Sequence, residues 1–94
     1  MFRCQVVHNS TAIRLIAHDS TNNVMRCVFT SGQGYDYPNV NTEDFDNLRH
    51  AESIGRQFNS DYRQRQDYVH VPNSEISNFV VRVLAQVPND LVEV

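Results

Sequence analysis

The sequence contains no lysine and no tryptophan, and its basic side chains are eight arginines, set against eleven aspartates and glutamates. Proteins that bind long nucleic acids usually carry a basic excess, because neutralising many phosphates drives their binding. The formal net charge of −3 therefore argues against binding to duplex DNA. Arginine still suits a site for a few phosphates, because its guanidinium donates in a planar fork and stacks on aromatic rings. A compositional bias would explain the missing lysine equally well.

Cysteine is scarce, and long apolar runs are absent. Cys4 and Cys27 are too few for a disulfide framework and stand in no Cys/His metal motif. They predict two buried thiols in a reducing compartment. Nowhere do about 18 apolar residues run together, and the first residues lack the apolar core of a secretory signal. We therefore expect a cytoplasmic protein that does not contact a membrane.

Catalytic signatures are nearly absent as well. The four histidines show no metal-ligand spacing, and no nucleophile elbow or Walker loop is present. On a helix, Asp44 and Asp46 would point about 200° apart, so they cannot act as paired carboxylates. We therefore predict no enzymatic activity, no cofactor and no metal site.

The first 40 residues have the pattern of a small antiparallel sheet. Alternating apolar residues predict a strand near residues 2–8, and aliphatic segments predict two more over 12–18 and 24–30. Residues 31–34 contain two glycines, Gly32 and Gly34, that can supply the positive φ angles of a hairpin turn. Tyr35 to Tyr37 then form a short fourth strand with both rings on one face, which ends at Pro38.

The remaining residues favour helices. Capping residues and the spacing of apolar residues predict a helix over 42–52, a break at 53–55, and a loop over 58–63 that enters a short helical turn. A longer amphipathic helix is predicted over 74–87, stopped by Pro88. In a chain of 94 residues this gives an α+β fold: a sheet of three to four strands, one or two helices and a C-terminal helix. We divide it into a domain at 1–66 and a helical extension at 67–94.

The C-terminal helix has two possible partners for its apolar face. It can pack on the sheet of its own domain, or it can contact a neighbouring subunit, since so small a core benefits from a partner. Val81 widens the apolar face beyond one stripe. We predict a homo-oligomer that forms through the following residues of this helix: Phe79, Val80, Val83 and Leu84.

Several short motifs follow one another in a recognisable order. They are Asn9-Ser10-Thr11-Ala12-Ile13, Phe29 with Ser31-Gly32, Tyr35-Asp36-Tyr37 with Val40, and residues 51–59 with Tyr62. In this order they resemble the KTSC domain over about residues 7–63. That small module stands at the C-terminus of some lysyl-tRNA synthetases and alone in bacterial and phage proteins. The chain departs from it by lacking lysine, by the bulky Ile54 and by the long C-terminal helix.

The resemblance implies a small antiparallel sheet followed by a helix, in a protein of a bacterial host cell. It implies no established activity, although the synthetase context suggests RNA binding. Two elements carry over to this chain: a Y-x-Y element and an S-x-G-x-x-F-N element. Their residues are Tyr35 and Tyr37 for the first, and Ser53, Gly55, Phe58 and Asn59 for the second.

Each of these elements has two readings. Two tyrosines about 7 Å apart on one strand face can stack a nucleotide base, or they can pack under the first helix against Phe45 and Leu48. The turn at Ser53 and Gly55 can offer N–H groups to an anion that nearby arginines neutralise, or Gly55 can simply cap a helix. The candidate ligand-binding residues are Tyr35, Tyr37, Ser53, Gly55, Arg56, Phe58, Asn59, Tyr62 and Arg63, with Arg65 nearby.

These observations predict a non-enzymatic binding module. Its ligand would be a small phosphorylated nucleotide, such as a signalling nucleotide that a phage or bacterial protein sequesters, or a short single-stranded RNA. The acidic net charge favours a ligand with few phosphates over a long polyanion. The alternative is a protein-binding adaptor or inhibitor that uses the C-terminal helix.

Overall fold

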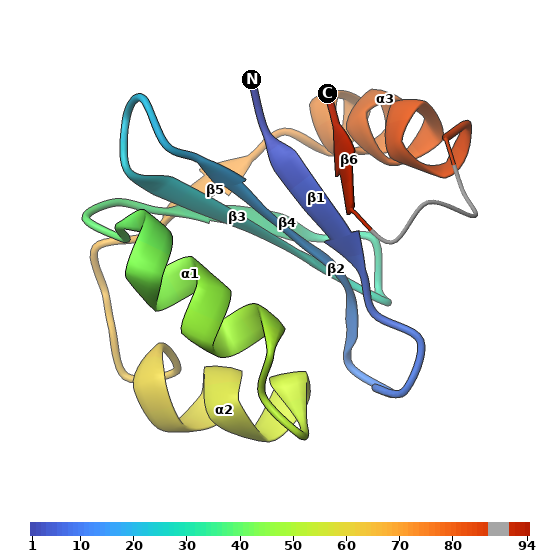
Figure 1. The fold of residues 1–94 in the computed structure, drawn as a ribbon. Helices are drawn as coiled ribbons and strands as arrows, with labels where there is room; N and C mark the ends of the chain where they lie inside the picture. Colours follow the sequence, from blue (N-terminus) through green and yellow to red (C-terminus); the bar gives the residue numbers. More distant parts are fainter. Residues whose placement is uncertain (87–90) are drawn as a thin grey trace.

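The computed structural model describes residues 1–86 and 91–94 (Figure 1). In this part of the chain, six strands form one antiparallel sheet in the order β5-β4-β3-β2-β1-β6. The α+β class is confirmed, but the predicted number of three to four strands was too low. The two strands at residues 69–71 and 91–93 were not predicted, because each has only three residues. The elements are β1 (Arg3–Val6), β2 (Ile13–Asp19), β3 (Val24–Phe29), β4 (Gly34–Tyr37), α1 (Thr42–Arg49), α2 (Ile54–Asp61), β5 (Val69–Val71), α3 (Asn73–Leu84) and β6 (Leu91–Glu93).

The sheet is covered on both faces. Helices α1 and α2 pack on one face and α3 packs on the other (Figure 1). Strand β3 shows how the residues alternate, because Met25 and Cys27 belong to the core under α1 and α2, whereas Val28 belongs to the core under α3. Burial on both faces explains why β2 and β3 are nearly continuous apolar runs.

The region between residues 42 and 62 folds as two helices rather than one. α1 ends at Arg49, earlier than the predicted 52, and residues 54–61 form α2 where a break and a loop were predicted. The reason is that Ser53 caps a new helix: its Oγ accepts a hydrogen bond from the backbone N–H of Arg56 at 3.3 Å. Ile54 and Phe58, four residues apart, then bury one side of α2.

Helix α3 packs on the chain's own sheet. Ile76, Phe79, Val80 and Val83 are buried in one core with residues of β1, β2 and β3, and Leu84 is partly buried against it. The apolar face predicted to form a homo-oligomer is therefore used inside the chain, although the homo-oligomer itself stays a prediction. The predicted helix residue Val87 and the stop at Pro88 lie outside the described residues. Across residues 1–86 and 91–94, none of the helices has the length and apolar character needed to cross a membrane.

Gly34 has a packing role instead of the predicted turn role. Of the two glycines of the hairpin, only Gly32 has a positive φ, of 95°. Gly34 lies buried in β4, where an added Cβ would stand 2.3 Å from Cδ1 of Ile76 in α3. The absence of a side chain at Gly34 therefore lets α3 approach the sheet closely.

A buried arginine links the sheet to α3. Arg26 donates from Nε and Nη2 to the two carboxylate oxygens of Asp36, at 2.8 and 3.0 Å, and from Nη2 to Glu75 of α3 at 3.0 Å. Its guanidinium carbon lies 4.6 and 4.8 Å from the ring centroids of Phe2 and Phe79. Burial alone would lower the pKa of Arg26, but its hydrogen bonds and charge pairs with Asp36 and Glu75 raise it above its usual value.

Candidate functional site

An aromatic cluster fills the space between β4 and α2. The ring centroid of Tyr37 lies 5.6 Å from that of Phe58, 6.0 Å from that of Tyr62 and 5.7 Å from that of Tyr68. Tyr35 lies on the same face of β4, as predicted, with its ring 5.2 Å from that of Tyr68. The alternative of packing under α1 alone was incomplete, because Tyr37 contacts Phe58 of α2 and shares one core with Phe45 and Leu48 of α1.

This cluster leaves a hollow of about 260 Å³. Five of the nine predicted ligand-binding residues line it, together with two that sequence reasoning did not select. Tyr68 is 45% exposed and Tyr35 partly exposed, so their rings are accessible to a ligand. The lining residues are Tyr35, Tyr37, Phe58, Asn59 and Arg63 from the prediction, and Phe29 and Tyr68 in addition.

The two tyrosines of Y-x-Y are not equivalent. Tyr37 is only 5% exposed, and burial is the main cause that raises its pKa from 10.0 to about 12. A ring so enclosed by its neighbours forms the floor of the hollow and has no open face on which a base could stack. The expectation of a platform made by both rings therefore needs correction, because Tyr35 and Tyr68 are the accessible pair.

Arg65 supports this cluster from the side. Its guanidinium lies 6.0 Å from the ring centroid of Tyr37 and 5.7 Å from that of Tyr62. It donates to the backbone carbonyl of Pro38 and, at 2.7 Å, to the carboxylate of Asp67. Arg65 is thus engaged within the chain, whereas Arg56 and Arg63 are exposed and form no ion pair with residues 1–86 or 91–94.

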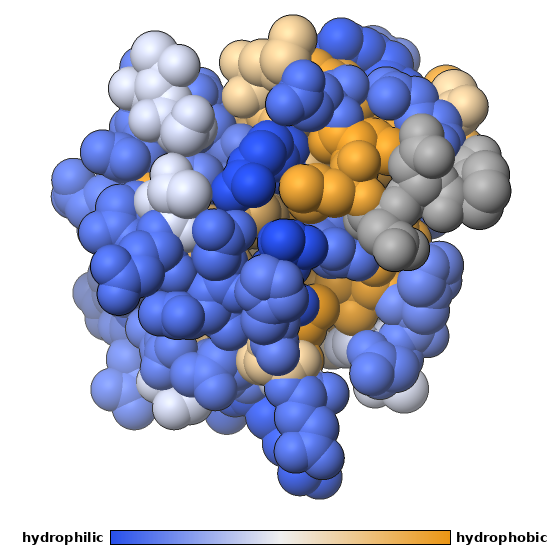
Figure 2. Space-filling view, viewed as in Figure 1, coloured by the Kyte–Doolittle hydropathy of each residue, from blue (hydrophilic) through white to orange (hydrophobic). Residues whose placement is uncertain are grey.

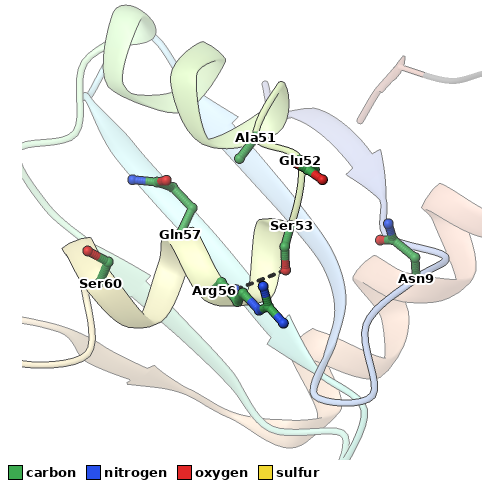
Figure 3. A pocket seen from close by; sticks show the side chains of 7 residues that line it. All are labelled: Asn9, Ala51, Glu52, Ser53, Arg56, Gln57 and Ser60. Carbon is green, nitrogen blue, oxygen red and sulfur yellow. Dashed lines mark hydrogen bonds between the residues drawn. The ribbon is translucent and has the colours of Figure 1, made fainter.

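A second, more polar hollow of about 580 Å³ lies at the start of α2 (Figure 3). Ser53 and Arg56 of the predicted site line it, and the hydrogen bond that caps α2 is drawn between them in Figure 3. Figure 3 also places Asn9, from the loop between β1 and β2, across from Ser53. The full lining is Asn9, Ala51, Glu52, Ser53, Arg56, Gln57 and Ser60.

Gly55 makes room for the neighbouring loop. It lies in the first turn of α2, not at the C-terminal end of a helix as the capping alternative required. A Cβ at this position would stand 3.2 Å from Oγ of Ser10, which accepts hydrogen bonds from the backbone N–H groups of Ala12 and Ile13. Two of the motifs that carry the resemblance, the one at Asn9–Ile13 and S-x-G, therefore meet in the fold.

Seven of the nine predicted site residues are thus divided between two hollows, and Gly55 and Tyr62 line neither. Tyr62 lines neither hollow: it is 6% exposed, ends α2 and stacks on Phe58 beneath the cluster, with a centroid distance of 5.6 Å. Burial is also the main cause that raises the pKa of Tyr62.

The two residues of the aromatic hollow that were not predicted, Phe29 and Tyr68, could have been found from the sequence. Phe29 belongs to the motif order, and Tyr68 stands directly before the short apolar alternation at Val69–Val71. Recognising that alternation as a strand next to Tyr35 would have placed Tyr68 at the site, because β5 pairs with β4 and brings His70 opposite Tyr35.

The described residues provide little for metal binding or thiol chemistry. Within residues 1–86 and 91–94, no three of the His, Cys, Asp or Glu side chains gather as metal ligands. Burial raises the pKa of the Cys4 thiol to about 12, despite nearby arginines that lower it, and burial raises that of Cys27 as well. Both thiols therefore stay protonated and unreactive near neutral pH.

Comparison with family models shows to which protein family this chain belongs. The family model described as the KTSC domain matches residues 9–68, well over half of the sequence. The chain belongs to the KTSC domain family. The match begins at Asn9, in the polar hollow, and ends at Tyr68, in the aromatic hollow, so both hollows lie wholly within the KTSC domain. A search of curated proteins finds no match.

Proposed function

We propose that this KTSC domain is a non-catalytic binding module for a nucleotide-type ligand, whose planar base enters the aromatic hollow. The observation that carries the proposal is the composition of that hollow. It combines two accessible rings, Tyr35 and Tyr68, with the exposed polar side chains of Asn59 and Arg63. Such a combination of apolar walls and a few polar groups is typical of small-molecule sites.

The size and chemistry of the hollow support a single base. Its volume of about 260 Å³ lies just below the range of roughly 300–1,000 Å³ for ligand pockets, so it suits one planar group. The amide of Asn59 has both donors and an acceptor for the edge of a base. The guanidinium of Arg63 suits a phosphate oxygen.

A short single-stranded RNA is the second ligand class for the same rings. Stacking on aromatic side chains serves RNA and free nucleotides alike. The net charge of −3 favours the smaller ligand, because an extended backbone would meet acidic surface beyond the site. The adaptor alternative needs an open apolar face on α3, but Ile76, Phe79 and Val83 are buried against the sheet, which favours the ligand hypothesis.

The proposal includes the absence of turnover. The hollow is lined by rings, an amide and an arginine, and a phenol with a pKa of about 12, such as that of Tyr37, is a poor proton acceptor at neutral pH. After incubation of the protein with common nucleotides, chromatography should detect only the unchanged nucleotides. Product that disappears after one point substitution would contradict this part.

Calorimetric titration with nucleoside monophosphates of adenine, guanine and uracil tests binding at the rings. We expect Tyr68→Ala to weaken binding roughly tenfold, because a stacked base contributes about 1–3 kcal/mol. Tyr68→Phe, which keeps the ring, should bind like the parent protein. Equal binding by all three proteins, with folds confirmed by circular dichroism, would place the site elsewhere.

A further inference from the structure

Two exposed arginines lie in α2 and in the turn that follows it. Arg56 belongs to α2, and Arg63 lies two residues beyond Asp61, the last residue of this helix. Arg56 lines the polar hollow and Arg63 lines the aromatic hollow. Asn59 and Ser60, also exposed, stand between them in the sequence: Ser60 lines the polar hollow with Arg56, and Asn59 lines the aromatic hollow with Arg63. The two hollows are therefore joined by a row of polar side chains that begins and ends with a positive charge.

These two charges are not used inside the described part of the chain. There, Arg3, Arg26, Arg49 and Arg65 form ion pairs, whereas Arg56 and Arg63 form none.

The remaining arginines without such pairs, Arg14 and Arg82, lie on β2 and α3 and line two other hollows. Arg56 and Arg63 are therefore the pair that one ligand could engage together.

We propose that the ligand is a free nucleotide with at least two phosphates, which run along α2 from Arg63 to Arg56. This inference rests on the proposed function, because it takes the base to lie in the aromatic hollow. A first phosphate then meets Arg63, and Arg56 faces solvent unless a second phosphate extends toward it. The polar hollow of about 580 Å³ offers room and hydroxyl or amide donors from Asn9, Ser53 and Ser60.

One acidic residue opposes this ligand. Glu52 also lines the polar hollow, but it comes from the loop before α2, not from the side of the helix that carries Arg56. Its carboxylate would repel a second phosphate and leave a first phosphate at Arg63 less affected. Removing the charge of Glu52 should therefore favour the diphosphate selectively.

The test is calorimetric titration of the whole chain with nucleosides, monophosphates and diphosphates of adenine, guanine and uracil. For the best base, we expect the diphosphate to bind roughly five- to tenfold more tightly than the monophosphate at low salt. Arg56→Gln should remove that gain and leave the monophosphate unchanged, and Glu52→Gln should increase it. Arg82→Gln, an exposed arginine on the opposite layer with the same change in charge, is the matched control and should change neither affinity.

Three results would overturn the inference while the proposed function survives. One is a diphosphate that binds no better than the monophosphate. Another is an equal loss for both nucleotides in Arg56→Gln, or the same loss in Arg82→Gln. A third is a short oligouridine that binds more tightly than every diphosphate, which would make RNA the ligand. If none of these probes binds, the proposed function fails and the inference fails with it.

Discussion

The sheet face under α3 and the sheet face under α1 and α2 are packed by different kinds of side chain. Under α3 the core is mostly aliphatic, and Arg26 ties the helix to the sheet through Glu75. Under α2 the core is rich in aromatic rings, whose edge-to-face contacts leave a hollow. In the view of Figure 2, hydrophilic residues cover the region of α1 and α2, whereas hydrophobic residues gather around β1 and β6.

This difference separates stability from binding. The aliphatic core under α3 and the close approach of this helix at Gly34 give the α3 face a structural role. On the other face the rings meet at steep angles, and Tyr35 and Tyr68 stay accessible beside the hollow that they line. We therefore expect substitutions on the α3 face to change the free energy of unfolding, and substitutions at the accessible rings to change ligand affinity.

The largest expected effect is at the buried arginine. Arg26→Ala should lower the free energy of unfolding by about 3–5 kcal/mol, because it leaves Asp36 without its bidentate partner. Glu75→Gln, which alters the exposed end of the same cluster, should cost no more than about 1 kcal/mol, since that side chain is 57% exposed. Urea unfolding followed by circular dichroism measures both. Equal and small losses would show that the cluster does not hold α3.

The next largest effect is expected from replacing a glycine, and we compare one glycine on each face of the sheet. Gly34→Ala should destabilise by about 1–3 kcal/mol, because its Cβ would overlap the buried side chain of Ile76. Gly55→Ala should stay within about 1 kcal/mol of the parent, because the gain in helix propensity offsets the tight contact with Ser10. The same unfolding measurements decide this pair, and the reverse ranking would contradict the proposed difference between the faces.

A pH effect distinguishes the enclosed tyrosine. Its pKa is raised from 10.0 to about 12, so the stabilisation linked to the protonated Tyr37 phenol is complete below pH 10 and is lost as the pH rises toward 12. The buried thiols act in the same direction from about pH 9, since the pKa of Cys4 is raised from 9.0 to about 12. Tyr37→Phe should therefore show a shallower fall of Tm between pH 10 and 12. Parallel curves for the two proteins would mean that Tyr37 is open to water.

The smallest effect concerns the exposed side of α3. Val81 is 67% exposed, so Val81→Glu should change stability by no more than about 0.5 kcal/mol. This variant also tests the predicted homo-oligomer. Val83→Glu is unsuitable for that test, because it would place a charge in the core and unfold the chain, whereas Val81 is exposed on the same helix. Sedimentation should give a lower mass for Val81→Glu than for the parent protein. An unchanged mass would contradict an interface on this helix.

The parts of the fold that depend on local patterns could be predicted. The α+β class, the first four strands, the C-terminal helix and the shared face of Tyr35 and Tyr37 all follow from periodicity over a few residues. The strands β5 and β6 could not be predicted, because three residues show too little periodicity and their partners β4 and β1 are distant in sequence. The start of α2 was missed because Ser53 was taken as a helix break when it is a cap.

For the candidate site, the sequence indicated several residues that line the aromatic hollow but not how they are arranged. Spacing indicated that Tyr35 and Tyr37 share a face, but it does not tell which helix covers them or which ring stays open. That depends on the path of residues 62–68, where Arg65 holds the turn against Pro38 and Tyr68 returns over the rings. No sequence pattern indicated that Arg26 links the sheet to α3, because its two carboxylate partners lie 10 and 49 residues away.

An NMR titration tests the central claim most directly. The ¹⁵N-labelled protein would be titrated with the nucleotide that binds best by calorimetry, and shift changes followed at every backbone amide. We expect the largest changes at Tyr35, Asn59, Arg63 and Tyr68, and none along α3. Changes concentrated along α3, or no changes with any nucleotide, would contradict the assignment of binding to the aromatic face.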